Sequence, residues 1–261
     1  MTALVLKLAL TPALIAGASL AGRRWGGAVS GWLVGLPLTS GPIAVIFTVE
    51  HGPRFAARGA VGSLSGAIAE GAFCLGFAWS GSRGWVVALL GATAAFAAAA
   101  VVAQSLPLSP RLPVPLLPLY AAALLGLAAT ARLLPRPAPA SGPPPPPPRW
   151  DLPVRALVAT GLVVFLTGVA TALGPRLTGL LAVFPVYAAV LAVFAYRHEG
   201  RTAALPVLRG VALGLLSFAT FFFALAALLG RIDSVAAFAC AAAAALGVQA
   251  ASFRRIHALA V

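Results

Sequence analysis

The sequence predicts an all-α integral membrane protein of about nine transmembrane helices. Two observations carry this prediction. Of the 261 residues, 61% are hydrophobic and only 9% are charged, and the mean hydropathy is +1.00. A chain of this composition has too little polar surface to cover a soluble globule. The chain also repeats itself after 148 positions, which predicts two copies of one membrane unit.

Residues inside apolar segments match the two copies without a gap. The matched positions are Gly26 and Gly174, Ser30-Gly31 and Thr178-Gly179, Leu33 and Leu181, Pro37 and Pro185, Gly52 and Gly200, Gly62 and Gly210, and Gly66 and Gly214. Five predicted spans separate equivalent points of the copies, and an odd number turns the second copy over in the bilayer. The sequence therefore predicts an inverted-topology repeat, as in many secondary transporters.

Runs of about 20 apolar residues can cross a hydrocarbon core of roughly 30 Å as helices. Nine such runs are present, at 3–22, 28–49, 56–79, 85–104, 112–131, 152–172, 177–196, 204–229 and 233–252. The first four correspond to the last four, and the fifth is a connector without a partner. The predicted units are a first four-helix repeat (1–107), a connector helix (108–134), a proline-rich linker (135–151) and a second, inverted repeat (152–261).

The net charge of +13 would suggest nucleic acid in a soluble protein, but here the cations lie at the ends of apolar runs. We therefore expect no nucleic-acid partner. One set of alternate loops holds Arg23, Arg24, Arg83, Arg132, Arg136, Arg149, Arg155, Arg197, Arg201, Arg209, Arg254 and Arg255, and the other holds Lys7, Arg54, Arg58, Arg111, Arg176 and Arg231. The richer side is expected to be cytoplasmic, which puts the N-terminus outside and the C-terminus inside.

Glycines at fourfold spacing predict faces on which helices pack closely. They are Gly27, Gly31 and Gly35 on the second predicted helix, and Gly62 and Gly66 on the third, which recur as Gly210 and Gly214 on the eighth. Lipid gives no hydrophobic reward for helix association, so close backbone contact is expected to hold the bundle together.

Glu70 continues the row of Gly62 and Gly66 at i, i+4 spacing, so we expect it on the same inward face. It is the only acid placed well inside a predicted span, where a charge costs at least about 2.5–3.5 kcal/mol. Two interpretations stay open. Glu70 is either protonated and hydrogen-bonded to a neighbouring helix, or it takes part in proton coupling or substrate contact.

The run 36–42 places two prolines and a glycine around Thr39 and Ser40 in the middle of a predicted span. This composition predicts a break, with Ser40 as the N-cap of a restarted half-helix whose positive end attracts an anion. The equivalent stretch 184–187 keeps one proline and is expected only to kink. Tyr187 in this stretch joins Thr39, Ser40 and Glu70 as a candidate substrate contact.

Glu50 and His51 follow the second predicted helix, and His198 and Glu199 follow the seventh, each pair before a turn glycine. We expect solvated interfacial turns with some gating potential. The inversion puts the two pairs on opposite membrane faces, so they cannot pool ligands for a metal. The sequence contains no catalytic nucleophile set, phosphate loop or dinucleotide fingerprint, and we expect no metal site, no cofactor and no enzymatic activity.

The stretches Thr178-Gly179-Leu180, Phe184-Pro185-Val186-Tyr187 and Glu199-Gly200 resemble the GlpM-like small inner-membrane proteins of bacteria. The resemblance covers about 152–252 and, through the repeat, more weakly 3–104. It implies the bacterial inner membrane, a fusion of two four-helix units, and an association with glycerol metabolism and exopolysaccharide production. A single-unit relative could assemble as a dimer, and for this chain we expect a monomer or a homodimer.

These features favour a transporter or translocator of a small or lipid-linked, anionic substrate within the lipid bilayer. The alternative is a non-transporting accessory or scaffold subunit of an envelope or exopolysaccharide assembly complex. A water-filled cavity touching Ser40 and Glu70 would favour transport. A closed, dry bundle with a large exposed groove would favour the accessory role.

Overall fold

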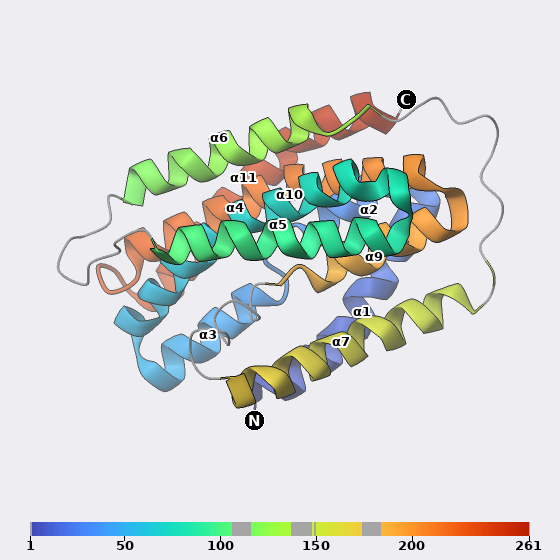
Figure 1. The fold of residues 1–261 in the computed structure, drawn as a ribbon. Helices are drawn as coiled ribbons and strands as arrows, with labels where there is room; N and C mark the ends of the chain where they lie inside the picture. Colours follow the sequence, from blue (N-terminus) through green and yellow to red (C-terminus); the bar gives the residue numbers. More distant parts are fainter. Residues whose placement is uncertain (1, 106–115, 137–147, 149, 174–183, 261) are drawn as a thin grey trace.

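The computed structural model describes residues 2–105, 116–136, 148, 150–173 and 184–260. Within these ranges the chain forms helices and no strand, which confirms the all-helical prediction (Figure 1). The helices are α1 Thr2–Trp25, α2 Gly27–Val34, α3 Ser40–His51, α4 Pro53–Ser80, the 3-10 turn η1 Gly81–Arg83, α5 Trp85–Ser105, α6 Leu116–Leu133, α7 Asp151–Leu173, α9 Val186–Glu199, α10 Arg201–Leu228 and α11 Ser234–Ala260.

Five of the described helices are long and apolar enough to cross a membrane. They are Pro53–Arg83, Trp85–Ala103, Leu116–Leu133, Arg201–Leu228 and Ser234–Phe253. Large apolar side chains such as Leu125, Leu157 and Val235 are exposed, which suits a surface that faces lipid rather than water. The fold is that of a multi-pass membrane protein.

Four of the nine predicted spans are not among these five helices of the described chain. The spans 3–22 and 152–172 form the helices α1 and α7, and the other two differ from the observed helices. The span 28–49 is divided into α2, with 8 residues, and α3, with 12 residues. Of the span 177–196, the first part lies outside the described residues, and the described part begins as α9 at Val186.

A single glycine joins α3 to α4 and another joins α9 to α10. Gly52 and Gly200 both have φ of 88°, with ψ of 162° and 178° respectively. The predicted glycine turns are therefore confirmed in having positive φ, but the extended ψ places them outside the left-handed helical region. This backbone conformation is essentially restricted to glycine, so any side chain at either position would be strained.

Helix α10 forms the centre of the bundle and is buried along most of its length. It contacts α2, α4, α6, α9 and α11. Figure 1 shows α6 and α11 along one side of the molecule, and α1 and α7 along the opposite side.

The closest helix contact joins α2 to α10 through glycine. A Cβ atom at Gly31 would collide with the backbone of Val207 and Val211, and one at Gly35 would lie 2.5 Å from the backbone of Gly214. The predicted role of these glycines in close packing is confirmed. The prediction is wrong for Gly62, whose Cβ would meet nothing within 4 Å.

The rotation of the helix explains the error at Gly62. Four residues of an α-helix turn about 400°, so each i, i+4 step drifts about 40° around the axis. From Gly62 to Cys74 the row turns by about 120°, and Gly62 is exposed while Gly66 and Cys74 are buried.

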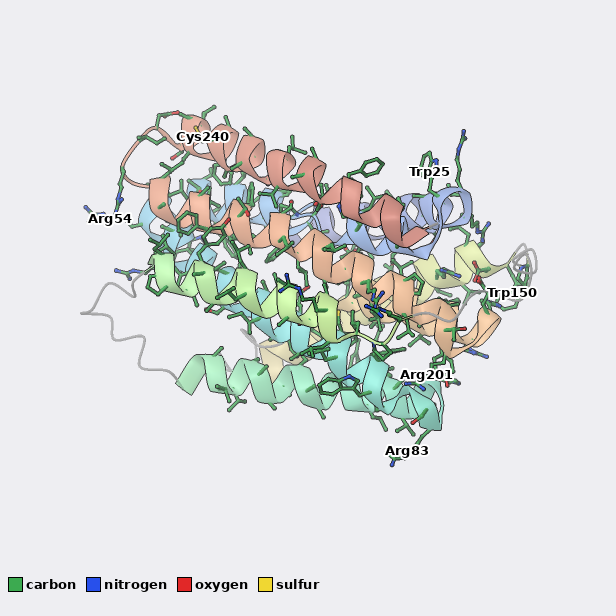
Figure 2. The ribbon with its side chains drawn as sticks, turned by 90° about the horizontal axis from the view of Figure 1, so that it is seen from above. Trp25, Arg54, Arg83, Trp150, Arg201 and Cys240 are labelled. Carbon is green, nitrogen blue, oxygen red and sulfur yellow. The ribbon has the colours of Figure 1, made fainter. Side chains whose placement is uncertain are left out.

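Helices α4 and α10 run in opposite directions. Arg54, at the start of α4, lies at one end of the molecule, and Arg201, at the start of α10, lies at the other end (Figure 2). Arg83, Trp25 and Trp150 lie at the same end as Arg201. The end with Arg201 thus collects residues from loops that the sequence assigned to the arginine-rich side.

Candidate functional site

The chain is broken between α2 and α3 around Pro37. The Leu38 N–H donates to the Leu36 carbonyl at 2.8 Å, which closes a tight turn centred on the proline. The Gly41 N–H then donates to the Pro37 carbonyl at 2.8 Å, and α3 follows. The predicted break is confirmed, and it follows from a residue that cannot donate to the helical ladder.

The predicted cap at Ser40 is wrong, because Ser40 is the first residue of α3 and Thr39 is its N-cap. Thr39 has helical dihedral angles and makes no side-chain capping bond. A side-chain cap is dispensable here, since the Pro37 carbonyl satisfies the Gly41 N–H, Pro42 has no N–H, and Ile43 donates to Thr39. The start of α3 therefore offers few free donors to an anion.

The equivalent stretch at Pro185 does more than kink, which corrects the prediction for 184–187. Pro185 has φ of −78° and ψ of 65°, and the Val186 N–H donates to the Phe184 carbonyl at 2.8 Å. This is the same turn as at Pro37, and α9 begins directly after it. The proline alone is enough for the turn, so the hydroxyls and glycine of the first stretch are not required.

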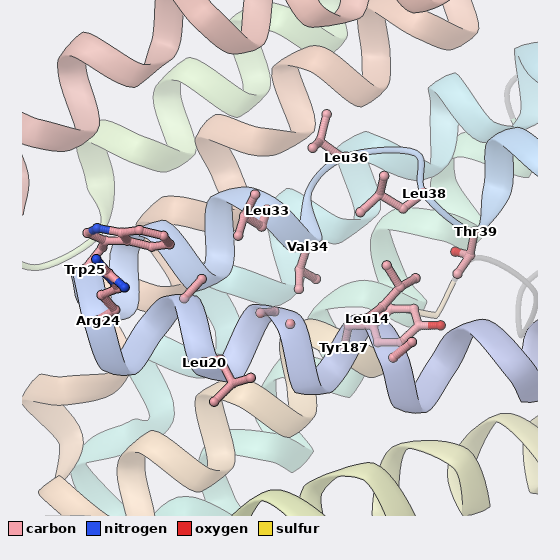
Figure 3. A pocket seen from close by; sticks show the side chains of 14 residues that line it. Leu14, Leu20, Arg24, Trp25, Leu33, Val34, Leu36, Leu38, Thr39 and Tyr187 are labelled. Carbon is pink, nitrogen blue, oxygen red and sulfur yellow. The ribbon is translucent and has the colours of Figure 1, made fainter.

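A pocket of about 420 Å³ lies beside the break at Pro37. It is bounded by α1, by the end of α2 with the following turn, and by one residue of α9 (Figure 3). Its lining is mostly apolar and consists of Ala13, Leu14, Gly17, Ala18, Leu20, Ala21, Arg24, Trp25, Leu33, Val34, Leu36, Leu38, Thr39 and Tyr187.

The pocket has polar groups at its two ends. Figure 3 shows Arg24 and Trp25 at one end, and Thr39 and Tyr187 at the other. The Tyr187 hydroxyl lies 3.0 Å from the Oγ1 atom of the fully buried Thr11, and Thr39 lines the same end of the pocket. This end of the pocket therefore gathers three hydroxyl side chains, of which Thr11 and Tyr187 are hydrogen-bonded to each other.

The structure brings Thr39 and Tyr187 together as two of the predicted substrate contacts. Within the described part of the chain, Ser40 and Glu70 do not line the pocket. Glu70 is half-buried on α4, where the neighbouring Gly71 packs against Thr130 of α6. Among the described residues, this pocket is therefore not the expected cavity that touches both Ser40 and Glu70.

The interfacial turns differ from one another. His51 stacks on Phe55 with ring centres 4.8 Å apart, and both Glu50 and Glu199 are exposed. His198 contradicts the expectation of a solvated turn, because it is half-buried and its Nε2 atom lies 3.0 Å from Oδ1 of Asp151. Its gating role stays a prediction.

Asp151 forms a buried ionic cluster that the sequence analysis missed. Its side chain is fully buried, with Arg23 Nη2 at 2.8 Å and Arg155 Nε at 3.0 Å from its carboxylate. Together with His198, these partners connect α7 to the end of α1 and the end of α9. The cluster lies at the arginine-rich end, where the neighbouring Trp150 is seen in Figure 2.

The assignment of Asp151 to the linker 135–151 is wrong, since it is the first residue of α7. Burial by itself would raise the pKa of Asp151, but hydrogen bonds from Arg155 and Arg23 and the nearby charges outweigh it and hold the pKa below its usual value. The available signal was Arg155, four residues further along a predicted helix, which is the spacing of an intrahelical ion pair.

Among the described residues, no group of three or more His, Cys, Asp or Glu side chains is placed to hold a metal ion. Comparison of the chain with protein-family models, with curated proteins and with solved structures gave no match. The site is therefore interpreted from its own geometry.

Proposed function

We propose that this protein is a transporter or translocator of a lipid-linked or small anionic substrate, built from two inverted four-helix copies joined by α6. In this proposal it is not an enzyme. It lies in a bacterial inner membrane with its N-terminus outside and its C-terminus in the cytoplasm, as a monomer or a homodimer. The GlpM-like resemblance is proposed as the origin of both copies.

The helix bounds support the duplication. Helix α4 spans 53–80 and α10 spans 201–228, so both ends are displaced by 148 positions. The same displacement relates the end of α3 at residue 51 to the end of α9 at residue 199. The opposite directions of α4 and α10 support the inversion (Figure 2).

The observation that best supports the proposal is that Thr39 and Tyr187 lie together. The two positions differ by 148, so each is the equivalent of the other in its own copy, and both line the same end of the pocket. Both follow a proline turn, and the turn at Pro37 separates α2 from α3. Transporters with inverted repeats place the substrate at the repeat interface beside discontinuous helices, where non-helical backbone is tolerated because it lines a cavity.

The apolar lining favours a lipid-linked substrate over a small water-soluble anion. A water-soluble anion needs several polar contacts, whereas this pocket offers hydroxyls at one end and Arg24 at the other, with apolar side chains between them. Glu70 is the residue proposed to couple transport to protons. It would act from α4, outside the pocket.

A translocation assay tests the proposal. The purified protein is reconstituted into vesicles containing a fluorescent anionic lipid, and a membrane-impermeant quencher reports how much lipid reaches the outer leaflet. We expect faster exchange than in protein-free vesicles, and a slower rate for Tyr187→Phe, which removes only the hydroxyl. Tyr120→Phe is the matched control, because its hydroxyl bonds Thr220 at 2.9 Å elsewhere in the bundle.

Glu70→Gln tests the coupling. It should leave membrane insertion intact and remove the dependence of the rate on a pH gradient, whereas Asp233→Asn at the start of α11 should leave that dependence unchanged. Vesicles with and without protein that behave alike, for both the lipid and a water-soluble anion, would contradict transport. That outcome would leave the accessory-subunit alternative.

A further inference from the structure

We propose that the pocket between α1 and the α2–α3 break holds one hydrocarbon chain of a phospholipid from the cytoplasmic leaflet, with the lipid phosphate bound by Arg24. This inference rests on the proposed function and names the chemical class that the same pocket takes. Three observations carry it: the length of the pocket, the side on which it opens, and the free cation at its mouth.

The length of the pocket corresponds to one leaflet. The lining residues on α1 run from Ala13 to Arg24 and Trp25, and eleven residues of helix rise by about 17 Å. Half of a hydrocarbon core of roughly 30 Å is about 15 Å. Thr11, beside the hydroxyl end, lies near the middle of the 24-residue α1, so the pocket extends from the middle of the helix to its arginine-rich end.

The wall of the pocket is open toward the surrounding lipid. Leu20 is 52% exposed and Leu38 is 42% exposed, although both line the pocket. A chain can therefore enter sideways from the bilayer without first crossing water. The volume of about 420 Å³ lies near the lower end of the range of small-molecule sites, which suits one chain rather than a whole two-chain lipid.

The mouth of the pocket suits a phosphate. Arg24 lies with its guanidinium 5.3 Å from the ring centre of Trp25, and among the described residues it has no carboxylate partner. Its neighbour Arg23 is held by Asp151 instead. A guanidinium binds phosphate oxygens through two parallel hydrogen bonds, and tryptophan favours the headgroup level of a membrane.

The inner end of the pocket accepts a chain end. The Tyr187 hydroxyl is hydrogen-bonded to the Thr11 hydroxyl at 3.0 Å, so this pair does not require a ligand to satisfy it. The ring of Tyr187 and the side chain of Leu14 complete this end (Figure 3). A hydrocarbon chain can contact these apolar surfaces without leaving a buried polar group unpaired.

Native mass spectrometry of the full chain in detergent tests the proposal. The probes are phosphatidylglycerol, which is anionic, and phosphatidylcholine, which has the same chains and a neutral headgroup. We expect one phosphatidylglycerol to remain bound per chain after removal of bulk lipid. Arg24→Gln should weaken this retention roughly tenfold or more, which is typical for loss of a hydrogen bond to a charged group. Arg83→Gln, at the same end of the molecule, should not weaken it.

Filling the pocket gives an independent variant. Gly17 lines the pocket, and a Cβ atom there would meet nothing within 4 Å, so Gly17→Phe should displace the lipid without disturbing the backbone. Gly161→Phe is the matched control, since Gly161 on α7 also faces open space but does not line the pocket. Thermal unfolding should be similar for the two variants.

Three outcomes would overturn the inference. They are equal retention of the two lipids by the native protein, unchanged retention in Gly17→Phe, and displacement of the lipid by inorganic phosphate, which would indicate a site for a free anion. The outcome separates this inference from the proposed function. Lipid retention without translocation would support the lipid site and contradict transport. Transport of a water-soluble anion without lipid retention would support transport and contradict the lipid site.

Discussion

At the scale of single residues, Asp151 has the largest role that hydropathy could not predict. It follows six prolines and an Arg-Trp pair, so a composition window assigns it to the linker. The structure instead buries it against two arginines and a histidine from three helices. Long-range ion pairs of this kind depend on tertiary packing, and the sequence shows only the Arg155 partner.

Asp151→Asn should destabilise the protein by roughly 2–3 kcal/mol, between the cost of breaking an exposed pair and that of breaking a buried one, because the carboxylate is buried but its partners are partly exposed. Thermal unfolding in detergent measures the effect. Asp233→Asn is the control, since Asp233 accepts the Val235 N–H at 2.9 Å and asparagine caps equally well. Equal melting of the two variants would contradict a stabilising cluster.

The lowered pKa of Asp151 predicts how stability depends on pH. A carboxyl whose pKa is lower in the folded state contributes stability above its ordinary pKa of about 3.9, and that stability is lost as the pH falls through the lowered value. The melting temperature of the native protein should therefore fall more steeply below about pH 4 than that of Asp151→Asn. Parallel melting curves from pH 7 to pH 3 would show that the cluster does not contribute.

At the scale of elements, the sequence predicted where the helix at 28–49 is broken but not how the chain turns there. Two prolines, a glycine and two hydroxyls predicted the break at Pro37, but the single proline at Pro185 produces the same turn. The glycine spacing predicted faces on which helices pack. It could not predict which helix packs on each face, because the spacing describes only one helix at a time. Gly210 and Gly214 pack on α2, and the equivalent Gly62 is exposed.

Gly214→Leu should separate α2 from α10. A Cβ atom at this position would lie 2.5 Å from the carbonyl oxygen of Trp32 and 2.9 Å from Cα of Gly35, and these backbone atoms cannot turn away as a side chain can. We expect destabilisation of at least about 2–3 kcal/mol, at the upper end for overpacking. Gly247→Leu on α11 is the control, because nothing lies within 4 Å of its Cβ position. Unchanged melting of Gly214→Leu in detergent would contradict the contact.

At the scale of the whole molecule, the proposed inverted duplication explains the common features of the two halves. It accounts for the matching helix bounds, the two glycine turns with φ of 88°, and the two proline turns. Composition was enough to predict the membrane class, and the pairing of helices between two inverted copies stays a prediction. The pocket could not be predicted, because it depends on how α1 lies against the turn after α2.

The most direct test of this account is the topology of the two glycine turns. Reporter enzymes that are active on only one side of the membrane are fused after Arg54 and after Arg201, which are equivalent within one residue in the two copies and lie at opposite ends of the molecule (Figure 2). An inverted repeat with a cytoplasmic C-terminus predicts an external reporter after Arg54 and a cytoplasmic one after Arg201. Reporters on the same side of the membrane would contradict the inverted repeat and, with it, a substrate site between the two copies.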